Sequence, residues 1–178
     1  MNGMQGKGLF AVLIMAMAAA ALADPEQDTV LAEKAFNAGD LPKTLELLRK
    51  AADQSYVPAQ VRLGEILDYA EEDEEAVRWF NIAVEQGSAA GELNLGAMYL
   101  KGEGVGQDFE KALYWIRRAA EQNYFPAAEF LARGYRMGGL GSGVDIEQAQ
   151  LWEARASAMK NSTAAEKPME KTKQGEAR

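Results

Sequence analysis

Tryptophan recurs at an almost constant interval along this chain, and this interval constrains the fold more than any other feature of the sequence. Trp79, Trp115 and Trp152 are 36 and 37 residues apart. The same spacing is kept by three alanines, namely Ala76, Ala112 and Ala149. A period of this length is typical of stacked supersecondary units, each of which buries its apolar face against its neighbours.

The clearest unit runs from Ala89 to Phe125 and contains two segments with apolar residues at helical spacing. The loop between them, Gly102 to Gly106, looks superficially like a phosphate loop. No strand precedes it and no Gly-Lys-Ser/Thr is present, so we interpret it as a helix connector. The same pattern on both sides of this unit predicts an all-α protein of eight helices in four hairpins.

Gly64 and Gly96 lie at equivalent repeat positions inside predicted helices, where a glycine costs about 1 kcal/mol relative to alanine. We therefore expect Gly64 and Gly96 to permit close approach of the paired helix, with Ala76 and Ala112 as their small partners. The tryptophans are predicted to fill the groove between successive hairpins. In the first helix, the residues expected in the core are Val30, Leu31, Ala35 and Phe36.

The residues of the clearest unit resemble the Sel1-like repeat, a tetratricopeptide-like helical repeat. The matching motifs are Leu95-Gly96-x-Met98-Tyr99, Gly102-x-Gly104-Val105, Asp108, Ala112, Trp115 and Ala119-Ala120-Glu121-Gln122. The resemblance covers about Val30 to Met159 and weakens toward the first copy. It implies an α/α superhelical solenoid of about four two-helix repeats, in which the first helices line a concave face, and it implies adaptor work.

The first 23 residues have a different character. Lys7 is the only charge before Asp24, and fifteen apolar residues follow it and end in Ala21-Leu22-Ala23. This pattern predicts a secretory signal peptide cleaved after Ala23, with an uncleaved membrane anchor as the alternative. We expect a repeat domain over residues 24–159 and a disordered polar tail over 160–178.

Composition narrows the chemistry. The chain has no Cys and no His, so ordinary zinc sites, Cys-His pairs and Ser-His triads are ruled out. Residues 24–159 carry 24 acidic against 13 basic residues, which disfavours nucleic acid as a partner. We interpret the acidic run Glu71 to Glu75 as a solvated edge rather than a calcium loop. We predict no cofactor, no metal and no enzyme, with a hydrolase using carboxylates as the less favoured reading.

Positions that differ between copies are the candidates for binding. Arg62, Asn94 and Phe130 occupy one equivalent repeat position, and Glu65 and Arg133 lie three residues after the first and last of them. Residues three apart on a helix share a face. If that face is concave, it presents a predicted protein-binding row of Arg62, Glu65, Asn94, Phe130 and Arg133.

These features together predict a periplasmic or secreted protein–protein interaction scaffold with no membrane span after signal cleavage. Its expected partners are proteins, such as components of envelope assembly, motility or secretion. A secreted factor that binds host proteins is the alternative. Because no folded cap is evident after Met159, the open end near Leu151 also leaves room for a homodimer.

Overall fold

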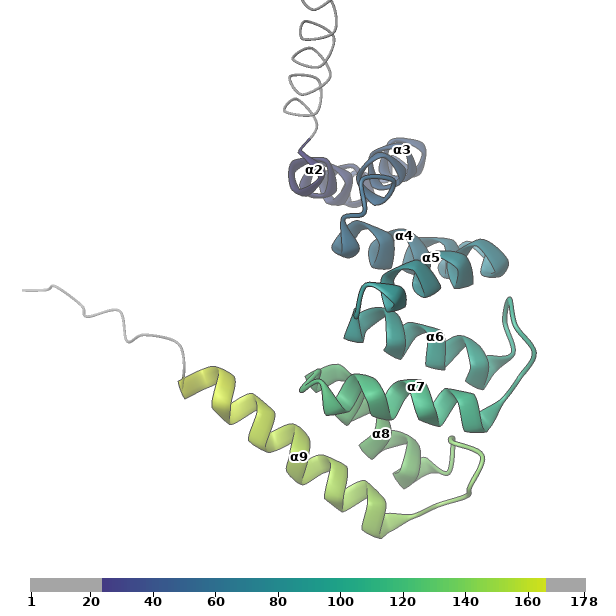
Figure 1. The fold of residues 1–178 in the computed structure, drawn as a ribbon, viewed down its shortest axis with the longest axis vertical. Helices are drawn as coiled ribbons and strands as arrows, with labels where there is room; N and C mark the ends of the chain where they lie inside the picture. Colours follow the sequence, from purple (N-terminus) through teal and green to yellow (C-terminus); the bar gives the residue numbers. More distant parts are fainter. Residues whose placement is uncertain (1–23, 166–178) are drawn as a thin grey trace, which may run out of the picture. The chain divides into compact units, whose positions relative to one another are not determined.

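The computed structural model describes residues 24–165, and their side chains as far as residue 162. The predicted signal peptide and residues 166–178 of the predicted tail lie outside this range. Within it the chain forms eight helices and no strand (Figure 1). The all-α helical-repeat fold predicted from the sequence is confirmed. Two compact units, Met1–Gly87 and Ser88–Arg178, are called here the N-unit and the C-unit.

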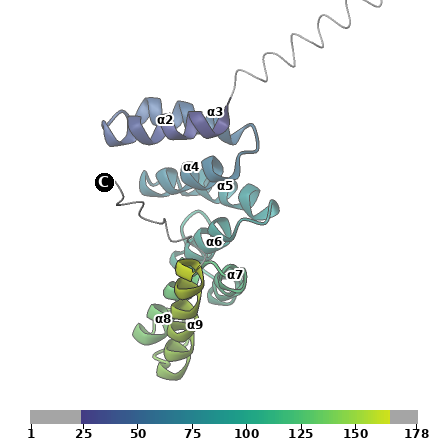
Figure 2. The ribbon, with the colours of Figure 1, turned by 90° about the vertical axis from the view of Figure 1, so that its left-hand side faces the viewer.

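The N-unit contains two helical hairpins. Their helices are α2 (Pro25–Asn37), α3 (Leu41–Ala52), α4 (Val57–Tyr69) and α5 (Asp73–Glu85). α2 pairs with α3 and α4 with α5, while α3 and α4 join the two hairpins (Figure 2). The side chain of Asp40 accepts a 3.0 Å hydrogen bond from the Lys43 amide, so it caps α3 as the sequence predicts.

The C-unit repeats this plan. Its helices are α6 (Ala89–Lys101), α7 (Phe109–Glu121), α8 (Phe125–Met137) and α9 (Ile146–Ala165). The predicted cap of α9 is present, because Asp145 accepts a 3.0 Å hydrogen bond from the Gln148 amide. α9 continues past its predicted end near Met159, since no Gly or Pro interrupts the chain before Pro168. No helix within residues 24–165 is long and apolar enough to cross a membrane.

Close approach at the helix glycines is confirmed, but the partners differ from those predicted. A Cβ on Gly64 would lie 2.5 Å from the ring of Phe80, so Phe80 and not Ala76 fills this space. A Cβ on Gly96 would lie 2.5 Å from Ile116 Cγ1 and 3.0 Å from the Ala112 carbonyl oxygen. Gly64 and Gly96 therefore each receive a bulky side chain from the second helix of their hairpin.

This packing corrects the predicted role of two tryptophans. Phe80 and Ile116 are buried, whereas Trp79 and Trp115, one residue earlier, are only half-buried. Successive residues on a helix point about 100° apart, so only one of each adjacent pair can face the opposite glycine. Trp152 is buried in the core of the C-unit as predicted.

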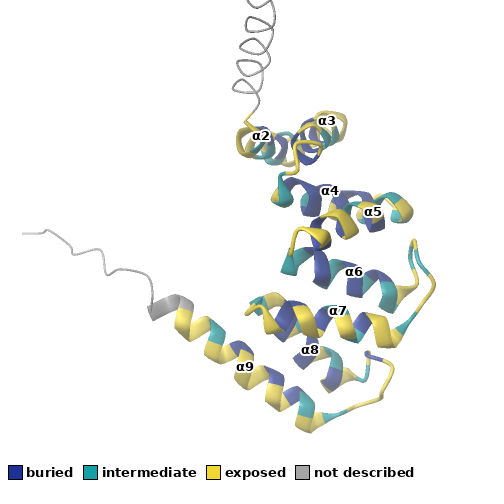
Figure 3. Ribbon diagram, viewed as in Figure 1, coloured by how far each residue is buried: buried dark blue, intermediate teal, exposed yellow. Residues whose placement is uncertain are grey.

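The predicted core of the first helix is wrong at three positions. Val30, Leu31 and Phe36 are exposed, and Ala32 is the apolar residue that α2 buries completely. α2 packs chiefly against α3, so only a narrow stripe of its surface is covered. Much of α2 is therefore coloured as exposed in Figure 3.

Candidate interaction surfaces

The C-unit has a groove of 810 Å³ between α8 and α9, which we call the α8–α9 groove. The residues that line it are Leu93 from α6, Phe125, Pro126, Glu129, Phe130, Ala132, Arg133, Arg136 and Met137 from α8, and Glu153, Ala156, Ser157 and Lys160 from α9. The lining thus combines apolar and charged side chains in one open groove. Such a mixture suits a protein segment better than a small apolar molecule.

Phe130 and Arg133, two of the predicted site residues, meet in this groove. Phe130 is half-buried and packs against the core of the C-unit. The guanidinium carbon of Arg133 lies 5.8 Å from the centre of the Phe130 ring, within the range of a cation–π contact. The core therefore holds the ring, and the ring holds the arginine at the surface of the groove.

The rim of the groove is braced by an ion pair. Arg136 of α8 donates to the Glu153 carboxylate of α9, which joins the two helices across the hollow. Met137 lies at the end of α8 and is 73% exposed. Neither Leu93 nor Met137 was predicted from the sequence, because apolar residues at helical spacing are first assigned to the core.

Asn94 is not among the residues that line the α8–α9 groove. It lies on α6 and is half-buried, and its neighbour Leu93 reaches the groove instead. Adjacent helix positions point in different directions, so a prediction that is one residue off selects another face. Asn94 therefore stays a predicted binding residue that lies outside this groove.

Arg62 of the N-unit is engaged inside its own unit. Its Nε and Nη2 atoms donate to the two oxygens of Glu33 at 2.6 and 3.2 Å. Nη1 donates to Glu65 at 3.2 Å, and the guanidinium carbon lies 4.9 Å from the centre of the Phe36 ring. Burial alone would lower the pKa of Arg62, but the hydrogen bonds to Glu33 and Glu65 outweigh it and raise that pKa.

Arg62 and Glu65 therefore lie together, as their spacing predicts. The residue that the sequence missed is Glu33, which belongs to the weakest copy of the repeat. No motif in that copy marks it. Its bidentate pairing with Arg62 fastens α2 to α4, so Arg62 has a structural role in addition to any binding role.

The acidic run of the N-unit is only partly solvated. Glu71, Glu72 and Glu74 are exposed, but Glu75 is paired with Arg49 of α3 and accepts a 3.2 Å hydrogen bond from the Trp79 indole. The hydrogen bond from Arg49 lowers the pKa of Glu75 against the opposing effect of burial. The sequence did not predict the pair of Arg49 and Glu75, because the two residues are 26 positions apart.

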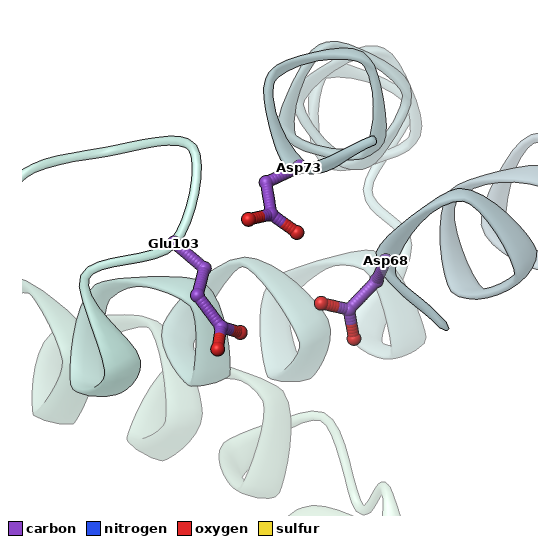
Figure 4. A group of neighbouring side chains, drawn as sticks. All are labelled: Asp68, Asp73 and Glu103. Carbon is purple, nitrogen blue, oxygen red and sulfur yellow. The ribbon is translucent and has the colours of Figure 1, made fainter. Parts of the chain in front are cut away.

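Figure 4 shows three carboxylates, those of Asp68 near the end of α4, Asp73 at the start of α5 and Glu103 after α6. Asp68 and Asp73 belong to the N-unit and Glu103 belongs to the C-unit, so the three are not a site within either unit. Two carboxylates supply at most four oxygens, and a calcium site takes six to eight, so backbone carbonyls or waters would have to complete one.

A buried carboxylate lies under the surface of the C-unit. Glu92 of α6 is fully buried, with one oxygen 3.1 Å from Arg118 Nε and the other accepting a 2.8 Å hydrogen bond from Gln122. Burial raises the pKa of Glu92, and the nearby Arg118 and Gln122 oppose that effect. Arg118 lies on α7 and Gln122 is its C-cap residue, so the carboxylate ties the first hairpin of this unit together.

A family model supports the repeat reading. The model of the Sel1 repeat matches residues 31–56, 57–88, 89–124 and 126–161. The boundaries between successive matches fall at or next to the turns between hairpins, whereas the first match begins inside α2 and the last ends inside α9. No curated protein matches the chain.

Several solved structures are similar. A Sel1 repeat protein from Oxalobacter formigenes is 27% identical, with a TM-score of 0.64 over 79% of this chain and 60% of that one. A protective antigen of uropathogenic Escherichia coli strains, which has the same repeat fold, is 29% identical, with a TM-score of 0.64 over 82% of this chain and 35% of that one.

A Sel1 repeat protein from Klebsiella pneumoniae is 22% identical, with a TM-score of 0.65 over 79% of this chain and 70% of that one, and supports the fold alone. This chain spans 60% and 35% of the length of the first two proteins. Because the family model matches four consecutive segments that cover most of residues 31–161, the chain belongs to the Sel1 repeat family.

Proposed function

We propose that this protein is an exported scaffold, periplasmic or secreted, that binds a segment of a partner protein and carries out no chemistry. Sel1 repeat proteins generally mediate protein–protein interactions and are typically non-catalytic. The apolar segment that ends in Ala21-Leu22-Ala23 supports export. The α8–α9 groove is the observation that carries the binding proposal.

The groove offers the side chains on which interfaces usually depend. Aromatic and arginine residues are the commonest anchors of binding energy, and Phe130 and Arg133 supply one of each within a single contact. Phe125 and Ala156 add apolar surface, and the ion pair between Arg136 and Glu153 fixes the rim. A partner segment would therefore find a preformed hollow and would order few side chains on binding.

The binding test uses Phe130→Ser and Arg133→Glu in affinity capture from an envelope extract. We expect each change to reduce recovery of a specific partner at least tenfold while the far-UV spectrum stays unchanged. Arg78→Glu is the matched control, because Arg78 is exposed on α5 and lines none of this groove. Equal recovery with the groove variants and the control would overturn the proposal.

Arg62 is a poorer choice for this test than its place in the predicted row suggests. Reversing its charge would break the pair with Glu33. It would also place a third carboxylate next to those of Glu33 and Glu65, so lost binding could reflect a disturbed N-unit. A double reversal of Arg62 and Arg133 is informative only beside the single Arg133→Glu variant. The single variant isolates the groove.

Export is tested separately by fractionation and by the N-terminal sequence of the processed protein. We expect the processed chain to begin at Asp24 and to be released with periplasmic proteins or into the medium. Retention of residues 1–23 in the membrane fraction would contradict cleavage and favour the anchor.

A secreted factor that meets proteins outside the cell is the second candidate. The observation that favours it is the similarity to a protein described as a protective antigen of uropathogenic strains. Recovery in the medium rather than the periplasm would select this candidate, and the groove test applies to both.

A further inference from the structure

The N-unit has a small apolar pocket at the turn ends of its two hairpins. Its volume is 150 Å³, and it is lined by Phe36, Gly39, Leu41, Ile66, Tyr69 and Ala70. None of these residues belongs to the predicted binding row. We call this hollow the N-unit pocket.

Three large side chains at this pocket are exposed. Phe36 and Leu41 are 39% and 40% exposed, and Tyr69 is 89% exposed at the end of α4. Apolar surface left in water costs about 25 cal/mol per Å², so three such side chains around one hollow mark a surface that gains by being covered. A dry cavity of about 150 Å³ holds a molecule the size of benzene, so the pocket has room for one aromatic or leucine side chain.

The walls of the pocket are held in place. Ile66 is 5% exposed and belongs to the core of the unit. The Phe36 ring lies under Arg62, which is itself fixed by both oxygens of Glu33. Gly39 adopts φ +78° in the turn, and nothing within 4 Å would contact a Cβ there, so this side of the pocket stays open.

Three exposed acidic residues adjoin the lining residues of the pocket along the chain. Asp40 precedes Leu41, and Glu71 and Glu72 follow Ala70 directly; all three are exposed. Residues 24–87 contain fifteen acidic and six basic residues, so the whole unit favours a cationic partner. An anionic or purely apolar partner would meet repulsion or leave these carboxylates without a counter-charge.

We propose that the N-unit pocket receives one aromatic or leucine side chain from a partner-protein segment that carries Lys or Arg beside that anchor. The apolar side chain would fill the hollow, and the flanking cations would face Asp40, Glu71 and Glu72. The proposal rests on the proposed function for the existence of a protein partner and gives that partner its chemistry. It uses residues of the N-unit alone, so it stands or falls independently of the α8–α9 groove.

The test uses an array of nine-residue synthetic peptides whose central residue is Phe, Leu, Ser or Glu and whose flanks are Lys, Ser or Glu. Binding to the purified protein is measured by amide chemical shifts at 50 and 300 mM salt. We expect the peptides with a central Phe or Leu between lysines to bind best, to shift the amides of Gly39 and Ala70, and to weaken at high salt.

Two kinds of variant separate the pocket from its charged rim. Leu41→Ser and Tyr69→Ser should each weaken the best peptide at least tenfold. The double change Glu71→Lys and Glu72→Lys, which leaves the pocket lining intact, should weaken it and remove most of its salt dependence. Tyr114→Ser, an exposed tyrosine of the C-unit, is the matched control and should bind as the unchanged protein does.

Four results would overturn the proposal. They are equal binding of lysine peptides with and without the apolar centre, shifts confined to the residues of the α8–α9 groove, no binding by any peptide, and a dimer in light scattering that Tyr69→Ser converts to a monomer. The last result would assign the pocket to a second copy of this chain. Arg133→Glu should leave peptide binding unchanged, so failure here is distinguishable from failure of the proposed function.

Discussion

The N-unit and the C-unit share one plan of two helical hairpins but differ sharply in charge. Residues 24–87 carry fifteen acidic and six basic residues, whereas residues 88–165 carry nine and eight. Both units place a glycine of one helix against a bulky side chain of the next. The two units thus share the packing of their cores but differ in their surface charges. We therefore expect binding specificity to depend on those surface charges.

The divergence extends to one buried position. Gln60 of α4 and Glu92 of α6 are both buried, and each accepts a hydrogen bond from the glutamine that caps the C-terminus of the following helix, Gln86 at 2.7 Å and Gln122 at 2.8 Å. In the N-unit the buried group is neutral and also donates to the Ala52 carbonyl. In the C-unit it is a carboxylate that needs Arg118. At this repeat position, therefore, only the C-unit has a stability that depends on the ionisation of a buried side chain.

The largest expected effect tests whether Phe80, rather than its neighbour Trp79, is the core residue of the N-unit. Phe80→Ala should lower the free energy of unfolding by about 3–5 kcal/mol, because a buried ring is removed and a cavity remains. Trp79→Ala should cost less, since Trp79 is half-buried. Urea denaturation measures both. A greater loss of unfolding free energy from Trp79→Ala than from Phe80→Ala would show that Trp79 is the core residue.

A smaller effect separates the two glycine contacts. Gly96→Ala should destabilise by about 1–3 kcal/mol, because the new methyl meets Ile116 and the rigid Ala112 carbonyl. Gly64→Ala should cost less, since the new methyl meets side-chain atoms of Phe80 and no backbone atom. Melting temperatures of the two variants measure the difference. Equal melting temperatures would show that backbone proximity does not distinguish the units.

Glu75→Gln in the N-unit should destabilise by about 1 kcal/mol or less at neutral pH, because the pair with Arg49 is partly exposed. The lowered pKa of Glu75 means that the ionised form stabilises the fold. This stabilisation is present above the unfolded-state pKa and is lost as pH falls through the folded-state pKa. Melting curves from neutral to acidic pH should therefore converge for the variant and the parent. A constant gap would contradict the assignment.

The smallest effect has the opposite sign and belongs to the C-unit. The raised pKa of Glu92 means that the folded state favours the protonated form, so stability declines as pH rises from the unfolded-state pKa through the folded-state pKa. Glu92→Gln, which copies Gln60, should remove this decline and stabilise the protein at neutral pH by less than about 1 kcal/mol. Melting temperature against pH tests it. Destabilisation at neutral pH would show that the pair with Arg118 outweighs burial.

The sequence predicted much of this architecture because repeat periodicity reports local structure directly. Helix number, pairing and the caps at Asp40 and Asp145 follow from spacing and capping chemistry. The packing within each hairpin was harder to predict, because a period cannot show which of two adjacent residues faces inward. That is why Phe80 was missed beside Trp79.

The contacts at the candidate surfaces were predicted in part. The contact between Phe130 and Arg133 could be predicted, because residues three apart on a helix lie on the same face. The pairing of Arg62 with Glu33 and that of Arg49 with Glu75 join residues 29 and 26 positions apart, and charge at that distance carries no signature in one sequence. The exposure of Phe36 likewise depends on how little of α2 its neighbours cover.

The most direct test of the scaffold proposal is photo-cross-linking in cells that produce the protein. A photoreactive residue replaces Met137, which is 73% exposed in the α8–α9 groove, or Val144, which is 62% exposed on a loop outside it. We expect the Met137 position to capture a discrete partner protein, the Val144 position to capture none of it, and Arg133→Glu to abolish the product. The same products from both positions, unaffected by Arg133→Glu, would contradict a partner-binding groove.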